Sequence, residues 1–283
     1  MLAWLRQHRG LRFLAYLHYM DPHDPYTPPA SLRPPPPTGV RPEIATGVVE
    51  GITQRMNHGR EPQLPAVEVA HLRNLYDAEI RAWDDSLAAL LAAIDRLGLR
   101  DSTVIVVTSD HGEEFQEHGR LKHGTHLYEE STHVPLVIAG PGIAPGRVAT
   151  TVEEIDVFPT LAALLGATAP PGLPGTNVLG PIAARAAISE TLLGVGTDGA
   201  SMPVISVRTA EWKLIRSPAL GRDELYDLRR DPGEHDDRFD AEPEGRRLIE
   251  ALAAWEQGLP APPPVEGRDP TLRDKLRALG YIE

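Results

Sequence analysis

The stretch "TVIVVTSDHGEEFQEHG", from Thr103 to Gly119, passes from an unbroken apolar run directly into acidic and imidazole side chains. A run that is apolar on both faces is typical of a central parallel strand. Asp110 and His111 follow at its carboxyl end, where open α/β sheets bind their ligands. A carboxylate beside an imidazole suits a divalent cation, so the pair predicts a metal site, with helix capping by Asp110 as the alternative.

The flanking sequence predicts a layered α/β sheet around this strand. "VPLVIAG" at 134–140 repeats the buried-strand pattern, and "FLAYLHY" at 13–19 predicts another strand after a short helix over 2–8. Apolar residues at three- and four-residue steps predict a core-facing helix over 67–97, which ends at Gly98, and a second helix over 154–167. Strands alternating with helices in this way indicate the α/β class.

The pattern changes near residue 200. "MPVISVRTAEWKLIRSP" at 202–218 predicts two antiparallel strands, and a helix is expected over 243–255. We therefore expect an α/β domain over 1–199 and a smaller antiparallel α+β subdomain over 200–283.

Composition excludes several classes of function. The chain has 28 basic and 40 acidic residues and a formal charge of -12, which argues against a nucleic-acid partner. It has no cysteine, so disulfides, thiolate metal sites and a cysteine nucleophile are excluded. The first twenty residues lack an apolar run long enough for a signal peptide or membrane span. The chain as written is therefore expected to be cytoplasmic with no membrane partner, and export of a longer parent protein is the alternative that leaves the compartment open.

Histidines gather around the predicted metal pair. Five of the eleven histidines fall between residues 111 and 133, and Lys122 and His123 stand just before the next core strand. A lysine or histidine in this place can hold an anionic oxygen, and a histidine can protonate a leaving group. The proline-rich segment 21–39 predicts a long loop that presents His23 at the same edge. The alternatives are solvated loop histidines and an exposed lysine.

Together these blocks resemble one family. "FLAYLHYMDPHDPY", "STVIVVTSDHGEEFQEHG", "LYEESTHVPLVIAGPG", "EIDVFPTLAALLGA" and "WKLI…ELYDLRRDPGE" are similar to successive blocks of the sulfatases, in the alkaline phosphatase superfamily. The blocks occur in the family's order across nearly the whole chain, and they correspond to the C-terminal half of a sulfatase. The resemblance implies an alkaline-phosphatase-like sheet that is incomplete at its N-terminal half.

The resemblance also implies roles for particular residues. Asp110 and His111 match ligands of the catalytic divalent ion, which is expected to be calcium, with manganese or zinc as alternatives. Lys122 or His123 matches the basic group that holds the sulfate, and His23 matches the histidine that protonates the leaving alcohol. The implied substrate is a small-molecule or glycan sulfate ester, and a phosphodiester or phosphonate monoester is the alternative within the superfamily.

Two parts of the sulfatase site are missing. The family's first paired aspartates have no counterpart, and neither C-x-P-S-R nor Ser-x-Pro-x-Arg, the source of the formylglycine nucleophile, occurs in the chain. We therefore expect a fragment that is inactive alone, whose protein partner is a missing N-terminal half or an oligomer. The competing explanations are a truncated reading frame, which we favour, a split enzyme, and a noncatalytic pseudoenzyme.

Overall fold

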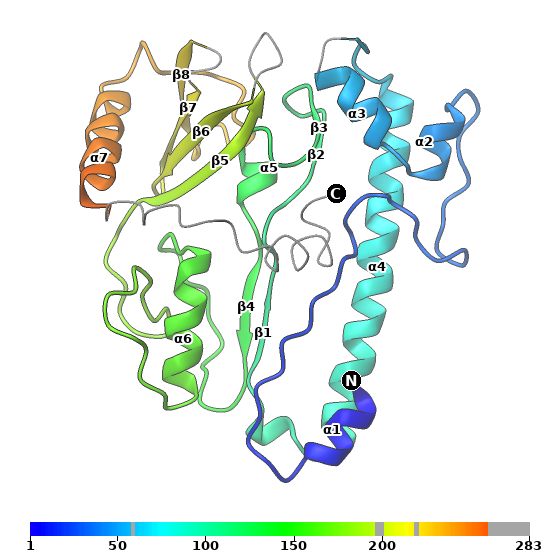
Figure 1. The fold of residues 1–283 in the computed structure, drawn as a ribbon, viewed down its shortest axis with the longest axis vertical. Helices are drawn as coiled ribbons and strands as arrows, with labels where there is room; N and C mark the ends of the chain where they lie inside the picture. The colour runs from blue at the N-terminus through cyan, green and yellow to red at the C-terminus, as the bar shows by residue number, and fades with distance from the viewer. Residues whose placement is uncertain (58–59, 196–200, 218–220, 260–283) are drawn as a thin grey trace, which may run out of the picture. The chain divides into compact units, whose positions relative to one another are not determined.

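The computed structural model describes residues 1–57, 60–195, 201–217 and 221–259 of the chain (Figure 1). Contacts divide the chain into two compact units, Met1–Gly245 and Arg246–Glu283, and the architecture below concerns the first. In chain order the helices and strands are α1 (Leu2–His8), α2 (Pro42–Thr46), α3 (Glu50–Asn57), α4 (Ala66–Arg96), η1 (Arg100–Ser102), β1 (Ile105–Thr108), β2 (Glu114–Phe115), β3 (Leu121–Lys122), α5 (Glu129–Thr132), β4 (Leu136–Ala139), η2 (Glu154–Asp156), α6 (Val157–Leu164), β5 (Ala187–Val195), β6 (Ser201–Arg208), β7 (Trp212–Ser217), β8 (Arg222–Asp227) and α7 (Glu244–Gly258).

The two predicted core strands form as β1 and β4, but their predicted parallel direction is wrong. They pair antiparallel, with Ile105 opposite Ala139 and Thr108 opposite Leu136. An apolar run reports burial and carries no information on direction, because direction depends on the connection between strands. Within the described residues no third strand joins this pair. On β4, the side chain of Val137 is 55% exposed.

The strand predicted over 13–19 does not form. The segment has no ladder partner among the described residues, and Tyr16 is 86% exposed. It runs instead as irregular chain beside α4, where Tyr19 meets Trp83 edge to face with ring centroids 6.2 Å apart (Figure 1). A strand requires a neighbour for its backbone hydrogen bonds, so the apolar pattern alone was insufficient.

The predicted helices are confirmed by α1, α4, η2 with α6, and α7. One buried cluster joins α4 to the loop before α2 and to the β2–β3 hairpin; its members are Tyr26, Ile44, Val49, Ile52, Leu64, Leu72, Leu75, Phe115 and Leu121. The cluster therefore holds two separate parts of the candidate site against the same helix.

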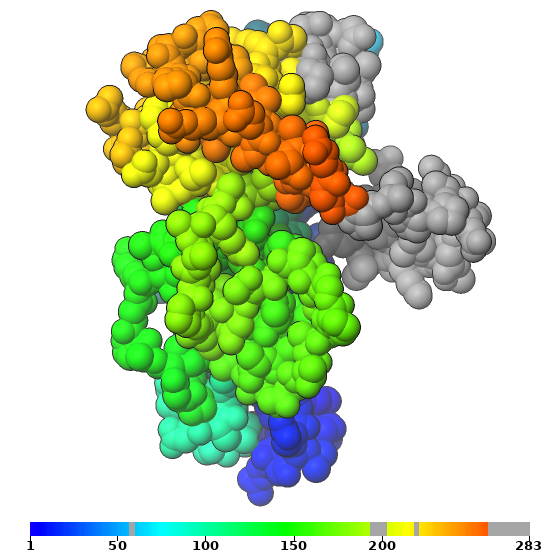
Figure 2. All heavy atoms as spheres, turned by 90° about the vertical axis from the view of Figure 1, so that its left-hand side faces the viewer, coloured from blue at the N-terminus to red at the C-terminus, as the bar shows by residue number. Residues whose placement is uncertain are grey.

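The predicted antiparallel hairpin is confirmed by β6 and β7, which are the centre of a four-stranded sheet of order β5-β6-β7-β8. This sheet already includes β5, which lies before the boundary expected at residue 200. The mostly exposed segment 165–186, between α6 and β5, lies at the surface facing the viewer in Figure 2. No helix in the described part of the chain is both apolar and long enough to cross a bilayer.

Candidate active site

The turn after β1 is built by close backbone packing. Gly112 donates its backbone N–H to Ser131 O at 2.9 Å, and a Cβ at this position would lie 2.0 Å from Glu130 O. Only glycine fits so close to α5. No helix begins after Asp110, so the capping alternative is excluded, and the chain continues into the β2–β3 hairpin. Packing against α5 therefore positions the predicted metal pair.

Asp110 and His111 present a carboxylate and an imidazole to the same space. His111 Nδ1 lies 2.9 Å from Gly112 O, and because a carbonyl can only accept, Nδ1 carries the proton and Nε2 keeps its lone pair. His111 Nε2 lies 3.7 Å from Asp110 Oδ1. This donor set and spacing fit a single divalent cation.

The loop that carries His23 is anchored on both sides. Tyr26, which is 1% exposed, donates its backbone N–H to Gly47 O at 3.0 Å. Glu79 on α4 accepts the backbone N–H of Thr27 at 2.6 Å. Burial, followed by the nearby charge of Asp21, raises the pKa of Glu79 to about 7 against the opposing Thr27 hydrogen bond. The proline-rich segment is thus fixed where it leaves His23.

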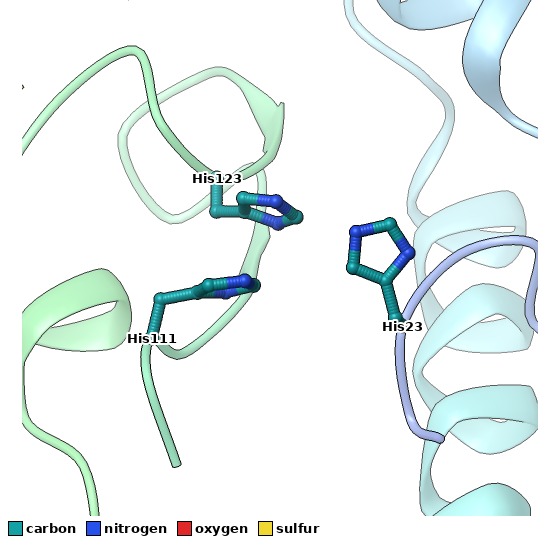
Figure 3. A group of neighbouring side chains, drawn as sticks. All are labelled: His23, His111 and His123. Carbon is teal, nitrogen blue, oxygen red and sulfur yellow. The ribbon is translucent and has the colours of Figure 1, made fainter. Parts of the chain in front are cut away.

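Three histidines meet at the site, and we name His23, His111 and His123 the histidine cluster. Each offers one ring nitrogen, and these atoms lie within 4.8 Å of one another. The rings of His111 and His123 are stacked with centroids 3.7 Å apart, and His23 faces them from the opposite segment (Figure 3). His23 lies 5.1 Å from His123 between ring centroids. Residues that are distant in sequence therefore bring their imidazoles together in one cluster.

Lys122, the other predicted basic group, has different partners. Its Nζ lies 2.9 Å from Asp24 Oδ1 and 2.5 Å from Glu50 Oε2. Burial would lower the pKa of Lys122, but the hydrogen bonds to Glu50 and Asp24 outweigh it and raise the pKa. The structure brings His123 into the histidine cluster and pairs the Lys122 ammonium with two carboxylates.

Glu113 was missed by the sequence reasoning. Its Oε1 lies 2.9 Å from His123 Nδ1, and its Oε2 accepts the Tyr26 hydroxyl at 2.9 Å. Burial and the charge of Glu113 raise the pKa of Tyr26, which keeps the phenol protonated. Glu113 and Tyr26 are 87 residues apart, so no local motif signals their contact.

A second set of charged side chains supports the β2–β3 hairpin. His118 Nδ1 contacts Glu130 Oε1 at 2.6 Å, while the buried Glu114 accepts the backbone N–H groups of His118 at 2.9 Å and Arg120 at 2.8 Å. Burial opposes the charge on His118, but the bonds to Glu130 and to the Glu234 carbonyl raise its pKa to about 9. These groups satisfy one another and hold the hairpin in place.

The same region is tied to the C-terminal sheet. Lys213 on β7 is fully buried and contacts Glu129 at 3.1 Å and Glu234 at 3.1 Å. Arg208 on β6 adds a second contact to Glu129 at 3.1 Å. Since Glu129 begins α5, these ion pairs connect the support of the metal-binding turn to the four-stranded sheet.

Comparisons with known proteins identify the family of the chain. The profile described as "Sulfatase" matches residues 1–167, and the profile "N-sulphoglucosamine sulphohydrolase, C-terminal" matches residues 116–255. A choline-sulfatase of Rhizobium meliloti is 34% identical over 167 residues, which are 58% of this chain and 32% of that protein.

Solved structures show the fold that the chain shares. A protein of Bacteroides thetaiotaomicron described as a sulfatase superposes with a TM-score of 0.62 at 19% identity, over 90% of this chain and 55% of that one. The phosphonate monoester hydrolase of Agrobacterium radiobacter superposes with a TM-score of 0.58 at 27% identity, over 68% of this chain and 42% of that one. The chain thus spans about a third of the curated relative and about half of the solved structures. These neighbours have the α/β fold predicted from the sequence.

Proposed function

Because the chain belongs to the sulfatase family, we propose that it supplies the metal-binding and leaving-group side of a sulfate-ester hydrolase. The observation that carries this proposal is the histidine cluster, which gathers side chains from the proline-rich loop, the turn after β1 and the β2–β3 hairpin. The substrate class that we propose is a small-molecule or glycan sulfate ester.

Asp110 and His111 would hold the divalent ion. The free lone pair on His111 Nε2 and the carboxylate oxygen 3.7 Å away support this assignment. When bound, the ion would neutralise charge on the ester's anionic oxygens. An imidazole ligand is compatible with manganese or zinc, whereas calcium prefers oxygen ligands, so the three ions should be compared directly.

His23 and His123 would contact the anion and the departing alcohol. Imidazolium groups hold a sulfate by charge-assisted hydrogen bonds, and a protonated His23 can give its proton to the alkoxide as the ester bond breaks. His23 Nδ1 lies 2.7 Å from Asp24 O, which leaves the second ring nitrogen for the substrate. Lys122 would act indirectly, because its ion pair with Asp24 holds in place the residue that follows His23.

The nucleophile must come from outside these 283 residues. The sequence has no cysteine and no Ser-x-Pro-x-Arg motif, so we propose that the chain is inactive alone and acts with a polypeptide that brings the nucleophile and the remaining ligands. Apolar side chains available for that contact include Leu14, 67% exposed, Val137, 55% exposed, and Phe158, 56% exposed. A noncatalytic pseudoenzyme is the competing proposal, and it is supported by the same missing motif.

A reconstitution experiment tests the proposal. The purified chain would be mixed with the N-terminal part of a sulfatase relative that carries the nucleophile, and aryl sulfate hydrolysis would be followed with calcium, manganese or zinc. We expect no turnover by either part alone, metal-dependent turnover by the mixture, and loss of turnover on Asp110→Ala. Glu117→Gln, which removes a half-exposed charge from the same hairpin, is the control and should retain turnover.

Two results would contradict this proposal. Turnover by the isolated chain would show that it contains a nucleophile, and a mixture that binds metal without turnover would favour the pseudoenzyme. The 27% identity to a phosphonate monoester hydrolase favours a second activity, so an aryl phosphonate would be offered in parallel. Faster hydrolysis of the phosphonate would assign the chain to that activity.

A further inference from the structure

The carboxylate of Glu113 lies between two donors behind the histidine cluster. Its side chain is 3% exposed, with His123 Nδ1 at 2.9 Å from one oxygen and the Tyr26 hydroxyl at 2.9 Å from the other. An ionised carboxylate can only accept hydrogen bonds, so both partners must donate. Nδ1 of His123 therefore carries a proton, and Nε2 is the ring nitrogen that remains available to contact a substrate.

The ring of His123 is held on its other sides as well. It stacks on His111 with ring planes 26° apart, and Figure 3 shows it directed away from its own backbone toward His23. Tyr26, which fixes the second oxygen of Glu113, belongs to the buried cluster against α4. The orientation of the imidazole is thus linked through one carboxylate to the hydrophobic core.

We propose that Glu113 is a positioning residue for His123: by accepting a hydrogen bond from Nδ1 it fixes the direction of the ring, so that Nε2 faces the sulfate subsite and donates its proton to the anion when the ring is doubly protonated. This inference rests on the proposed role of His123 in holding the anion. Unconstrained histidine favours the tautomer with the proton on Nε2, which would offer a donor from a ring free to turn. A buried carboxylate partner on Nδ1 reverses that preference and restricts the ring, as second partners do for ligand histidines.

The neighbouring Glu114 shows that the role belongs to Glu113 and is not shared by every acid of the hairpin. Glu114 accepts the backbone N–H groups of His118 and Arg120, and its ion pair is with His126. Glu117 pairs with Arg73 at the surface. Of these three acids in the described chain, Glu113 is the one that contacts His123, and Glu117 is therefore a matched control.

The test reads the tautomer of His123 directly. Long-range nitrogen–proton correlation spectra of the intact, nitrogen-labelled chain distinguish the two tautomers, and the His123 signals are assigned by their disappearance in His123→Asn. We expect wild-type His123 to carry its neutral-state proton on Nδ1. Glu113→Ala should shift the ring to the Nε2 tautomer, Glu113→Gln should largely restore the Nδ1 tautomer because its amide oxygen still accepts, and Glu117→Gln should have no effect.

Sulfate binding separates this inference from the proposed function. Inorganic sulfate would be titrated while the His123 signals are followed, and Glu113→Ala is expected to weaken binding about tenfold, with smaller losses in Glu113→Gln and Tyr26→Phe. An Nε2 tautomer in the wild type, or an unchanged Nδ1 tautomer in a folded Glu113→Ala, would overturn the positioning role. If the tautomers are as expected and sulfate does not shift the signals, the positioning role stands and the anion-binding role fails. If Glu113→Ala does not fold, the wild-type tautomer decides.

Discussion

The strands β1 and β4 differ from the region beyond the end of β1 in which side chains they bury and expose. Along the strands, apolar groups such as Val137 are exposed to solvent. Beyond the end of β1, charged groups such as Glu114 of β2 and Lys213 of β7 are fully buried and paired. The loop end is held by ion pairs formed within this chain, whereas the strands leave apolar side chains exposed. The candidate site lies at this loop end.

The largest effect on stability is expected when a buried positive charge is removed beside the loop end. Lys213→Ala would leave the buried Glu234 without its cation and Glu129 with Arg208 alone, and we expect it to lower the free energy of unfolding by about 3–5 kcal/mol. Urea denaturation followed by circular dichroism measures this. Arg81→Ala removes one partner of an exposed pair with Asp85 and should change the free energy by at most about 0.5 kcal/mol. Equal effects of the two variants would contradict the comparison.

A second change concerns the support of the His23 loop. Burial raises the pKa of Glu79 to about 7, above its unfolded value of 4.5. Its contribution to stability is therefore present below pH 4.5 and lost as pH rises through 7. Glu79→Gln should raise the free energy of unfolding at pH 8 by about 2 kcal/mol and leave it nearly unchanged at pH 4.

The control for Glu79 is Asp85→Asn on the same helix, where the side chain is 55% exposed. It should not change the pH dependence. A wild-type stability that stays constant between pH 4.5 and 8, after correction by this control, would show that Glu79 ionises normally.

A third change tests the charge of His118. Its pKa is raised to about 9, mainly by Glu130 against the opposing effect of burial. Because the folded value exceeds the unfolded one, the stabilisation is present below pH 6.5 and is lost as pH rises through 9. His118→Gln should reduce the loss of stability between pH 7 and 10 by about 1–2 kcal/mol, measured by urea denaturation at several pH values. His133→Gln, at an exposed site, should keep the wild-type slope.

The smallest effect is expected at exposed apolar residues of β4 and α6. Val137→Thr and Phe158→Ser replace exposed apolar side chains, and each should change the stability of the isolated chain by less than about 0.5 kcal/mol. Both should reduce self-association in light scattering and weaken binding of the N-terminal sulfatase part used in the proposed reconstitution. Leu225→Ala, at a fully buried site, should cost about 2–5 kcal/mol and serves as the contrast. A large loss of stability from Val137→Thr would show that this surface is already covered.

Local patterns were sufficient where local contacts decide the structure. Helix α4 and the β6–β7 hairpin follow from periodicity and a short turn, and both were predicted. The direction of β1 against β4, and the failure of residues 13–19 to form a strand, depend on neighbours that no local pattern specifies. An apolar run predicts that a segment is buried, but it does not specify which strand the segment pairs with.

The candidate site divides in the same way. Asp110 and His111 were predicted because a strand end, a glycine and two ligand types are adjacent in sequence. The difference between Lys122 and His123 was not predictable, because it depends on Asp24 and Glu50 from other segments. The link from Glu113 to Tyr26 joins positions 87 residues apart, and only the folded core brings them together.

The close contact of Gly112 with α5 limits how this sequence can be recombined with its relatives. The turn packs on Glu130, and the adjacent Glu129 pairs with Arg208 and Lys213 of the four-stranded sheet. A chimera whose junction falls between α5 and β6 would combine a turn from one parent with the ionic partners of another. A chimera that preserves the site should therefore take residues 110–133 and the four-stranded sheet from the same parent.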